Sequence, residues 1–455
     1  MNPPKLAAKA LAVNPLKVSQ PMGASLAFMG LGRTLPLEHG AQGCTAFSKV
    51  FFTRHFREPI PLQTTAMDHV VAIIGADQNI VEALHTVAQA HAPAIIGLVS
   101  TGLAEMQGAD IVRSIAQFRA VHPEHAAMAV VPVATPDTLG NLESGFALAV
   151  EAIIDGLLPK SACAGRRPRQ VNVLASAMLT PGDLEAIVEW IEAFELAPLV
   201  LPNLGDSLDG HLGTDGYSAI TDGGITRAQI ASMGESAATL VIGPSLSKAA
   251  EVLTARTGVP ARLFDSLLGL ERCDAFTLAL SELSGRAVPA RLERQRAQLL
   301  DAMVDCHFPL STARVGVAGD PDLVAALTHF VTTLGAEAPV VVASAKAAST
   351  KVEGLIVGDL QDFEREAERR QVDVLIANSH AAEAALRLGR PLLRAGFPLY
   401  DQAGGHTRAW VGYRGTRQAV FDLTNLLSGS RREPAPYRSI FWQGTPRADE
   451  AFSPR

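Results

Sequence analysis

The feature of this sequence that most constrains its fold is a unit that occurs three times along the chain. Each copy has a short apolar run, a turn, an amphipathic segment with helical period and a second apolar run. Apolar strands that alternate with helices of this length are typical of parallel sheets. Pro or Asp at the start of the helical segments supports these helix starts. We therefore predict an α/β protein with three doubly wound parallel-sheet domains and binding crevices at the carboxyl ends of the strands.

The strands and helices of the three units can be read from the apolar periodicity. In each unit, the first strand is followed by a helix and then by the second strand, and two further apolar runs predict additional strands. The predicted strands are 70–74, 94–99, 171–174, 199–202, 239–243, 315–319, 340–342 and 372–376, and the predicted helices are 79–90, 182–194 and 321–334.

Changes in composition suggest where the domains divide. The stretch 159–169 is polar and contains Gly and Pro, and the charged helical stretch 289–306 has the character of a connector. The last residues are rich in Pro, Ser and Arg, which is typical of a surface tail. We predict an N-terminal domain at 1–165, a second domain at 166–306, a third at 307–430 and a tail at 431–455.

Composition excludes several classes of protein. The 455 residues are 48% hydrophobic and 19% charged, which is too apolar for a disordered chain. The net charge of −7 gives no basic footprint for nucleic acid. We find no signal peptide and no 18-residue apolar stretch, so we expect neither export nor a membrane span. Four cysteines in a chain of this length do not form a disulfide framework, and a cytoplasmic location is expected.

The cysteine with the most suggestive surroundings is Cys44, which follows Gly40 and Gly43 in a predicted bend. Glycines let backbone N–H groups approach a bound ligand, and such groups stabilise thiolates and cluster sulfides. Cys44 is therefore a candidate metal ligand, but one thiolate cannot hold a four-iron cluster. The alternative is an inert, buried cysteine, and this is the interpretation we favour for Cys163, Cys273 and Cys306.

Other polar features leave two interpretations open. The segment Arg54–Pro59, with its two arginines and one histidine, either lends positive potential to an anionic cluster at Cys44 or is an interface or solvated segment. Asn378–His380 follows a predicted strand and is either part of a site or a helix cap. The sequence contains no nucleophile elbow, P-loop, HExxH or CxxC motif, so the chain is poorly equipped to be a catalyst by itself.

Several segments together resemble the β-type subunits of nitrogenase component 1. The resemblance covers nearly the whole chain, and in detail it is to the β-like subunits of the scaffold on which the iron–molybdenum cofactor is matured. It implies three Rossmann-like domains. The matching segments are 19–24, 39–44, 54–59, 64–68, 100–105, 179–184, 208–211, 394–398 and 412–415.

This resemblance gives Cys44 a specific role. The catalytic β subunit uses three cysteines to help hold the eight-iron P-cluster, and the first and third fall at Ser19 and Gly102 here. Serine oxygen is a poor ligand for such iron and glycine has no side chain, so an intact P-cluster site is not expected. In the scaffold proteins the remaining cysteine gives one ligand to an interfacial [4Fe–4S] cluster, and the partner subunit, NifE, supplies three.

The resemblance also implies partners. It predicts a non-catalytic subunit in an α2β2 complex with NifE, which is expected to hold most of the iron–molybdenum cofactor precursor. NifB, the nitrogenase iron protein and the catalytic nitrogenase component are expected as transient partners. Two alternatives remain: a subunit of an enzyme, either catalytic nitrogenase or protochlorophyllide reductase, and a small-molecule binding protein whose cysteine is inert.

Overall fold

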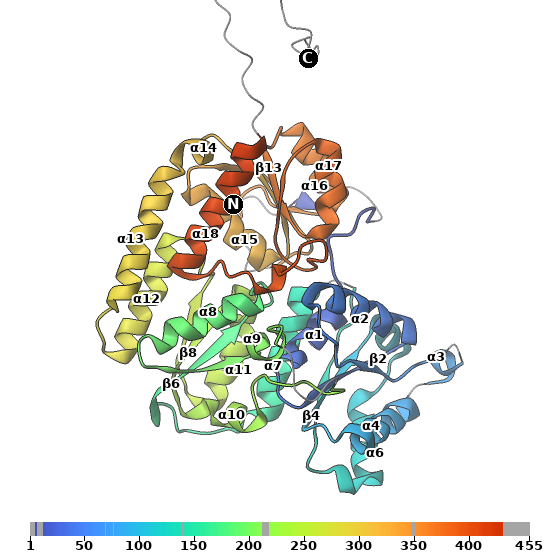
Figure 1. Ribbon diagram of the computed structural model, residues 1–455. Coiled ribbons are helices and arrows are strands. Elements are labelled where there is room, and N and C mark those ends of the chain that lie inside the picture. Colours follow the sequence, from blue (N-terminus) through green and yellow to red (C-terminus); the bar gives the residue numbers. More distant parts are fainter. Residues whose placement is uncertain are drawn as a thin grey trace, which may run out of the picture.

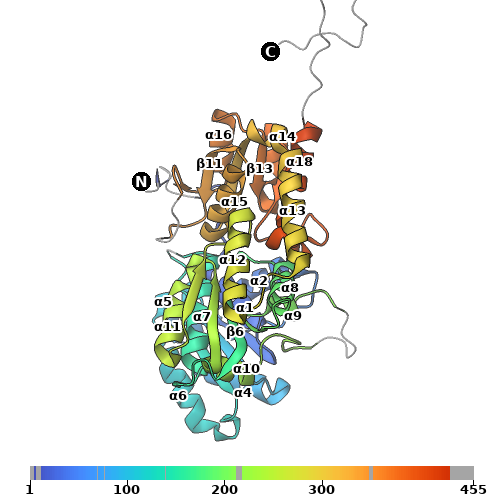
Figure 2. The same cartoon turned by 90° about the vertical axis from the view of Figure 1, so that its left-hand side faces the viewer.

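The computed structural model describes residues 5–6, 12–68, 70–75, 77–138, 140–211, 218–347 and 352–430. In this part of the chain the strands form three sheets, in which neighbouring strands run parallel, and helices pack around each sheet. The first two sheets lie in the lower part of Figures 1 and 2 and the third lies above them. The predicted α/β class with three parallel sheets is therefore confirmed.

The first sheet has the strand order β3-β2-β4-β5. Its central strands β2 and β4 are buried from both sides, because alternate residues face different helices. Leu35 and Leu98 pack with α4 and α6, whereas Gly97 lies against Phe28 of α1 on the other face. The elements are α1 (Gln20–Met29), β2 (Thr34–His39), α2 (Gln42–Phe56), β3 (Gln63–Thr64), α3 (Val71–Ile74), α4 (Asp77–His91), β4 (Ile95–Ser100), α5 (Gly102–Gln107), α6 (Ile111–Val121), η1 (Pro123–His125), β5 (Ala129–Val133) and α7 (Leu142–Leu157).

The predicted strand 70–74 is wrong, because these residues form the end of a loop and the short helix α3. The Asp68 carboxylate accepts hydrogen bonds from the N–H groups of Val70 and Val71, which starts the helical turn. Val70 and Ile73 remain exposed. A short apolar run cannot be assigned to a strand or a helix by periodicity alone, and here no neighbouring strand in the described part of the chain pairs with it.

The second sheet has the order β7-β6-β8-β9, and its predicted strands 171–174, 199–202 and 239–243 are confirmed, although all three begin earlier than predicted. The elements are β6 (Arg167–Ala175), α8 (Pro181–Glu192), β7 (Ala197–Leu201), α9 (Leu204–Ser207), α10 (Arg227–Ser232), η2 (Met233–Glu235), β8 (Ser236–Ile242), η3 (Pro244–Leu246), α11 (Ser247–Thr257), β9 (Ala261–Phe264) and α12 (Leu270–Ser284).

The third sheet has the order β1-β12-β11-β10-β13-β14, and it includes the N-terminal strand β1. The chain therefore pairs with the third sheet before it forms the first. The elements are β1 (Lys5–Leu6), α13 (Ala290–Asp305), α14 (His307–Ser311), β10 (Arg314–Gly319), α15 (Pro321–Thr333), β11 (Glu337–Ala343), β12 (Ile356–Val357), α16 (Leu360–Arg369), β13 (Val374–Ala377), η4 (Ser379–Ala381), α17 (Ala382–Leu388), β14 (Leu392–Arg394), η5 (Gly405–Thr407) and α18 (Gly412–Ser430).

The domain limits at 165, 306 and 430 stay a prediction, and the proposed tail 431–455 lies outside the described residues. No helix in the described part of the chain combines the length and the hydropathy that crossing a membrane requires.

Helices α1 and α7 pack so closely that their backbones touch. A side chain at Gly23 would meet the carbonyl oxygen of Leu142 at 1.8 Å, and one at Gly145 would meet the carbonyl oxygen of Gln20 at 2.0 Å. Only glycine fits at both positions, because the clashing atoms are main-chain atoms that cannot rotate away. This contact fixes the start of α1 against the start of α7.

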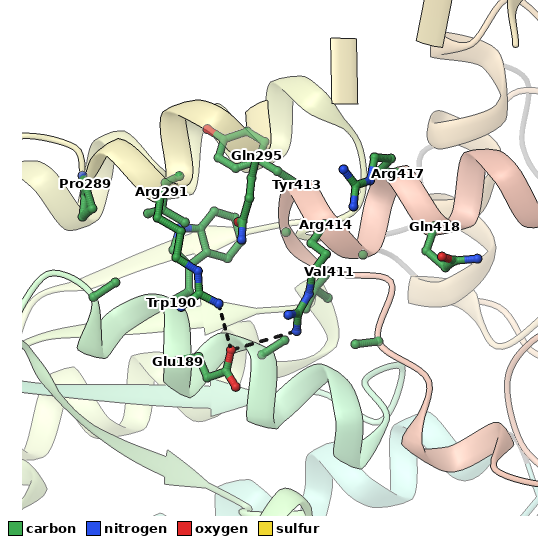
Figure 3. A pocket seen from close by; sticks show the side chains of 16 residues that line it. Glu189, Trp190, Pro289, Arg291, Gln295, Val411, Tyr413, Arg414, Arg417 and Gln418 are labelled. Atoms are coloured by element: carbon green, nitrogen blue, oxygen red, sulfur yellow. Dashed lines mark ion pairs between the residues drawn. The ribbon is translucent and has the colours of Figure 1, made fainter. Parts of the chain in front are cut away.

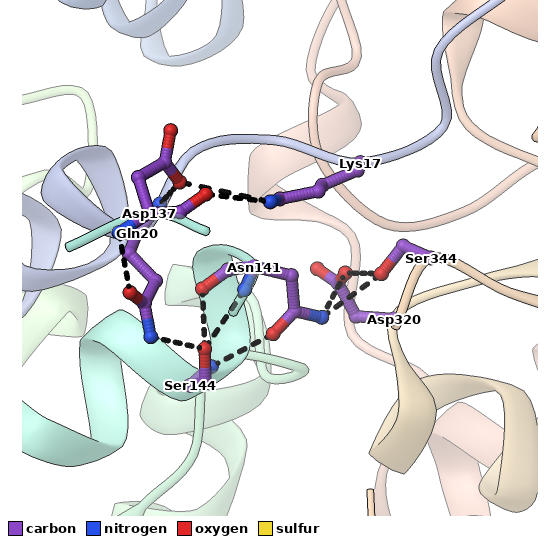
Figure 4. A network of polar contacts seen from close by, with 7 residues as sticks. All are labelled: Lys17, Gln20, Asp137, Asn141, Ser144, Asp320 and Ser344. Carbon is purple, nitrogen blue, oxygen red and sulfur yellow. Dashed lines mark hydrogen bonds and ion pairs between the residues drawn. The ribbon is translucent and has the colours of Figure 1, made fainter. Parts of the chain in front are cut away.

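A polar network extends from this contact to the third sheet (Figure 4). Asn141 is the N-cap of α7, and its side-chain amide donates hydrogen bonds to Asp320 Oδ1 and Ser344 Oγ, both at 2.9 Å. On the other side, Gln20 Nε2 donates to Ser144 Oγ at 3.1 Å. These bonds join the beginnings of α1, α7 and α15, and so connect the first and third sheets.

Buried carboxylates join all three domains beside this network. Glu143 of α7 accepts a hydrogen bond from the N–H of Asp322 in α15, at 2.8 Å. The Asp322 carboxylate in turn accepts one from the N–H of Ser245 in η3, at 3.0 Å. We call Glu143, Asp322 and Ser245 the three-domain junction. Burial raises the pKa of Glu143, and it raises the pKa of Asp322 to about 6.

We predict that replacing Asp322 with asparagine will raise stability at neutral pH. The folded protein keeps a proton on Asp322 that the unfolded chain has lost, so its free energy of unfolding falls as pH rises from about 4 to about 6. The asparagine side chain stays neutral, and its amide oxygen can still accept from the Ser245 N–H. The free energy of unfolding at pH 7.5 should rise by about 1–3 kcal/mol, measured by denaturant unfolding from pH 4 to 8.

The matched control is Asp305→Asn on the exposed end of α13, which should follow the wild-type profile. An unchanged decline of stability between pH 4 and 6 in Asp322→Asn would contradict the assignment of that decline to Asp322.

Candidate functional site

Cys44 lies in the first turn of α2, at the carboxyl edge of the first sheet. The chain leaves β2 at His39, Ala41 is extended and forms the N-cap, and the helix begins at Gln42. The predicted bend is thus shorter than expected, and Cys44 belongs to the helix that follows it. This is the strand-to-helix crossing at which doubly wound sheets bind ligands.

The surface around Cys44 is open. The thiol is exposed, and a side chain added at Gly43 would meet no atom within 4 Å. Ala41 has no side-chain acceptor, so no side chain of the N-cap residue occupies the N–H groups of the first helical turn. Such groups, together with the helix dipole, favour an anion at this end of the helix. The Cys44 N–H donates to the Ala41 carbonyl oxygen at 3.2 Å, so the exposed thiol and the N–H groups of Gln42 and Gly43 are the features that suit an anionic metal–sulfur group.

The other cysteines do not share this environment. Cys273 and Cys306 are buried, and Cys163 is half-buried in the connection to the second sheet. Burial raises the pKa of the Cys273 thiol to about 12, so this thiol stays protonated. The predicted inert role therefore fits Cys273, whose thiol contacts the Leu267 carbonyl oxygen and Thr416.

Positions 19 and 102 lie at the same edge as Cys44. Strands β2 and β4 are adjacent, and the Thr101 N–H donates to the His39 carbonyl oxygen at 3.2 Å, so α2 and α5 begin side by side. Ser19 is the N-cap of α1, and the next N–H, of Gln20, donates to Asp137 Oδ1 at 2.8 Å. A side chain at Gly102 would lie 3.9 Å from Asp137 Cβ. One loop therefore borders both positions.

Buried polar groups hold the first turn of α2 in place. Glu38 of β2 is 1% exposed, and its carboxylate accepts hydrogen bonds from Thr45 Oγ1 at 2.9 Å and from Ser25 Oγ at 3.0 Å. Burial raises the pKa of this carboxyl group. The neighbouring His39 bonds Thr65 Oγ1 through Nδ1 at 2.9 Å, and burial lowers its pKa to about 4, so it is neutral. These side chains position the helical turn that carries Cys44.

Exposed apolar side chains lie on α2 after Cys44 and on the helices α3 and α5 of the same sheet edge. Phe47 and Val50 follow Cys44 at helical spacing on α2 and are 70% and 51% exposed. Ile73 of α3 is 84% exposed and Met106 of α5 is 81% exposed, and these two helices contact each other. We call Cys44, Phe47, Val50, Ile73 and Met106 the Cys44 face. Such a group of exposed apolar residues is typical of a protein interface. The spacing 44, 47 and 50 was visible in the sequence, but only the fold reveals that it faces outward.

The hypothesis that Arg54 and His55 give positive potential to Cys44 is wrong. They lie about ten residues further along α2, which places them about 15 Å from the thiol. Arg54 stacks 4.2 Å above the Tyr400 ring, and Arg57 donates to the Tyr400 carbonyl oxygen. Burial lowers the pKa of His55 to about 3, and its Nδ1 accepts from the Leu399 N–H. The alternative interpretation, an interface or solvated segment, is the correct one, because these residues contact the third domain while Arg54 and Arg57 stay exposed to solvent.

Asn378 acts as a helix cap. Its side-chain oxygen accepts a hydrogen bond from the His380 N–H, and its amide donates to the Phe397 carbonyl oxygen. The capping interpretation is confirmed, and these bonds use both ends of the side chain.

A separate cavity of about 380 Å³ lies between α8, α13 and α18 (Figure 3). Its lining includes three arginines, Arg291, Arg414 and Arg417, and one carboxylate, Glu189. Arg291 and Arg414 approach Glu189 only to 3.9 and 4.0 Å, and these three side chains are well exposed. The cavity contains none of the residues at positions 19, 44 or 102, so it is distinct from the Cys44 edge.

This chain is similar to known proteins over most of its length, both in sequence and in fold. Curated NifN proteins, named as nitrogenase iron–molybdenum cofactor biosynthesis proteins, are similar to it. The protein from Klebsiella pneumoniae is 44% identical over 95% of this chain and 94% of its own length. The one from Bradyrhizobium diazoefficiens is 41% identical over 96% and 94%. A solved structure titled "Nitrogenase Cp1 at pH 6.5" matches with a TM-score of 0.88 and 29% identity, over 95% of this chain and 98% of that one.

The family description that matches residues 19–428 is nitrogenase component 1 type oxidoreductase. The match begins at Ser19 and ends within α18, so it includes all three sheets except β1. The chain belongs to the nitrogenase component 1 type oxidoreductase family, in which it is similar to the NifN proteins.

Proposed function

We propose that this chain is the β-like subunit of a scaffold complex on which the nitrogenase iron–molybdenum cofactor precursor is matured. The similarity to NifN proteins over almost the whole chain supports a role in cofactor biosynthesis. The proposed partner is NifE, in an α2β2 complex that holds the precursor mainly on the NifE side. NifB, the nitrogenase iron protein and the catalytic component would bind transiently.

In this proposal Cys44 gives one thiolate to a [4Fe–4S] cluster and NifE gives the other three. The observation that carries it is the exposed thiol of Cys44 at an edge where positions 19 and 102 hold Ser and Gly. Such a cluster is held by four ligands, so the thiolate of Cys44 would supply one of them. The open surface at Gly43 leaves room for the cluster, and the first-turn N–H groups can donate to its sulfides.

The same edge argues against the eight-iron cluster of the catalytic β subunit. A hydroxyl at position 19 is a hard oxygen donor, which suits iron–sulfur chemistry less well than a thiolate. A side chain at position 102 would meet the Pro136 carbonyl oxygen at 3.2 Å, so even a cysteine there would require the loop to move slightly. We therefore assign the chain an assembly role rather than a catalytic one.

The Cys44 face is the proposed docking surface for NifE. Its apolar side chains lie at the same sheet edge as the thiol, so a partner that supplied the remaining ligands would also cover them. Burying apolar area contributes about 25 cal/mol for each Å² removed from water. Cluster ligation and subunit association are thus expected to depend on the same surface.

We predict that Cys44→Ala will lower the iron content of the purified complex with NifE and alter its EPR signal, because the cluster loses its only ligand from this chain. The measurement is iron and sulfide analysis with EPR on protein prepared without oxygen. Cys163→Ala, a half-buried cysteine in another region, is the control and should keep both values. Unchanged iron and an unchanged spectrum in Cys44→Ala would refute the ligand assignment.

We predict that Phe47→Glu will weaken association with NifE at least about tenfold, because a carboxylate replaces an apolar anchor beside Cys44. The dissociation constant measured by calorimetry or size-exclusion titration tests this. Leu386→Glu is matched in chemistry, since Leu386 is 82% exposed on α17 of the third domain. Equal affinities of the two variants would show that the Cys44 face is not the docking surface.

A further inference from the structure

Three histidines and one glutamate gather at the end of the first domain that is opposite to Cys44. His85 lies within α4, His122 is the C-cap of α6, and Glu124 and His125 belong to η1, just before β5 begins. In a parallel sheet the amino and carboxyl ends of the strands form opposite edges. This group of four side chains, which we call the histidine cluster, is therefore separate from the Cys44 edge.

The ligand atoms of His85, His122 and Glu124 converge, and His125 borders them. Glu124 Oε1 lies 3.1 Å from His122 Nδ1, 3.9 Å from His85 Nδ1 and 3.9 Å from His125 Nε2. His85 Nδ1 and His125 Nε2 are 3.2 Å apart. A tetrahedral zinc ion with ligands at about 2.0–2.1 Å separates those ligands by about 3.3 Å. The ligand atoms of His85, His122 and Glu124 all lie within 4.8 Å of one another, so modest side-chain movement would bring them to that spacing, and His125 Nε2 lies beside His85 and Glu124.

Packing holds the imidazoles near one another. The rings of His85 and His122 stack with centroids 3.9 Å apart, and the His125 ring lies parallel to Phe118 at 6.0 Å. Arg119 donates a hydrogen bond to the His125 carbonyl oxygen at 2.7 Å, which fixes the backbone of η1. These contacts come from conventional helix and turn packing, so the side chains need little reorganisation to bind a ligand.

The hydrogen bonds among these side chains leave some of their lone pairs available to bind a cation. A neutral imidazole has one N–H donor and one lone pair, so the contact between His85 Nδ1 and His125 Nε2 needs one proton and one lone pair. The Glu124 carboxylate has two oxygens, and the side chain is 55% exposed. A divalent ion could replace the shared proton and accept lone pairs from the imidazoles and the carboxylate together. Nitrogen and oxygen donors of this kind suit zinc and similar borderline cations.

We propose that His85, His122 and Glu124 bind a divalent transition-metal ion, with zinc as the best-fitting ion and His125 as the fourth ligand. The ion would tie η1 to α4. All four ligand positions are filled by side chains, which is typical of structural rather than catalytic zinc sites, so we assign the ion a structural role. This proposal does not depend on the proposed role of Cys44 or on NifE.

The test is a titration of the metal-stripped, full-length chain with Zn²⁺ alone. Calorimetry measures the binding, and thermal unfolding measures the stability with and without Zn²⁺. Every protein in this test also carries Cys44→Ala, which removes the exposed thiol as a competing ligand. We expect one ion per chain and a higher melting temperature when the site is filled, because the ion binds the folded state. His122→Ala and Glu124→Gln should each weaken binding at least about tenfold.

His91→Ala is the matched control, because His91 is an exposed histidine at the end of the same helix, α4. It should bind Zn²⁺ like the parent chain. Glu124→Gln changes an exposed side chain, so it is not expected to disturb the fold, and weaker binding in this variant would reflect the loss of a ligand. The proposal is overturned if the parent chain shows no saturable binding of one ion, or if His122→Ala and Glu124→Gln bind as tightly as His91→Ala.

Discussion

The three-domain junction is the interaction on which the arrangement of this protein depends. Glu143, Asp322 and Ser245 come from helices beside three different sheets and are linked by two hydrogen bonds from backbone N–H groups. The two carboxyl groups are buried, which raises their pKa values. Buried acids cost stability when they ionise, so the junction carries a penalty at neutral pH that the surrounding packing must offset.

The junction also determines the geometry of the Cys44 edge. Glu143 lies in the first turn of α7, and α7 touches the backbone of α1 through Gly23 and Gly145. The start of α1 then bonds Asp137, whose loop borders Gly102. A disturbance at the junction would therefore reach positions 19 and 102, which border the Cys44 edge. In this chain those positions carry no thiol. The packed helices therefore surround one thiol at this edge, that of Cys44.

The sequence predicted the buried parts of the strands, as in β4 and β10 and in the second halves of β6 and β11, but not the exposed beginnings of β6 and β11. It failed at residues 70–74, where an apolar run is a short exposed helix. It also placed Arg54 and His55 near Cys44, because closeness in sequence was taken as closeness in space. Both residues lie about 15 Å from the thiol along α2, where they contact the third domain. The pairing of β1 with β12 had no local signal, because it joins residues far apart in the chain. The histidine cluster had only a partial one, because His122, Glu124 and His125 are close in sequence whereas His85 joins them through the fold.

The Cys44 face and the junction place opposite demands on the chain. The junction is buried and complete within one polypeptide, whereas the face exposes the apolar Phe47 one helical turn from a free thiol and further apolar side chains on α3 and α5. Exposed apolar groups and a free thiol are liabilities for a chain that works alone, because they favour aggregation and oxidation. Both liabilities disappear if one partner covers the apolar side chains and brings thiolates to the same iron–sulfur cluster. The rigid core then serves to hold an incomplete site in the orientation that the partner completes.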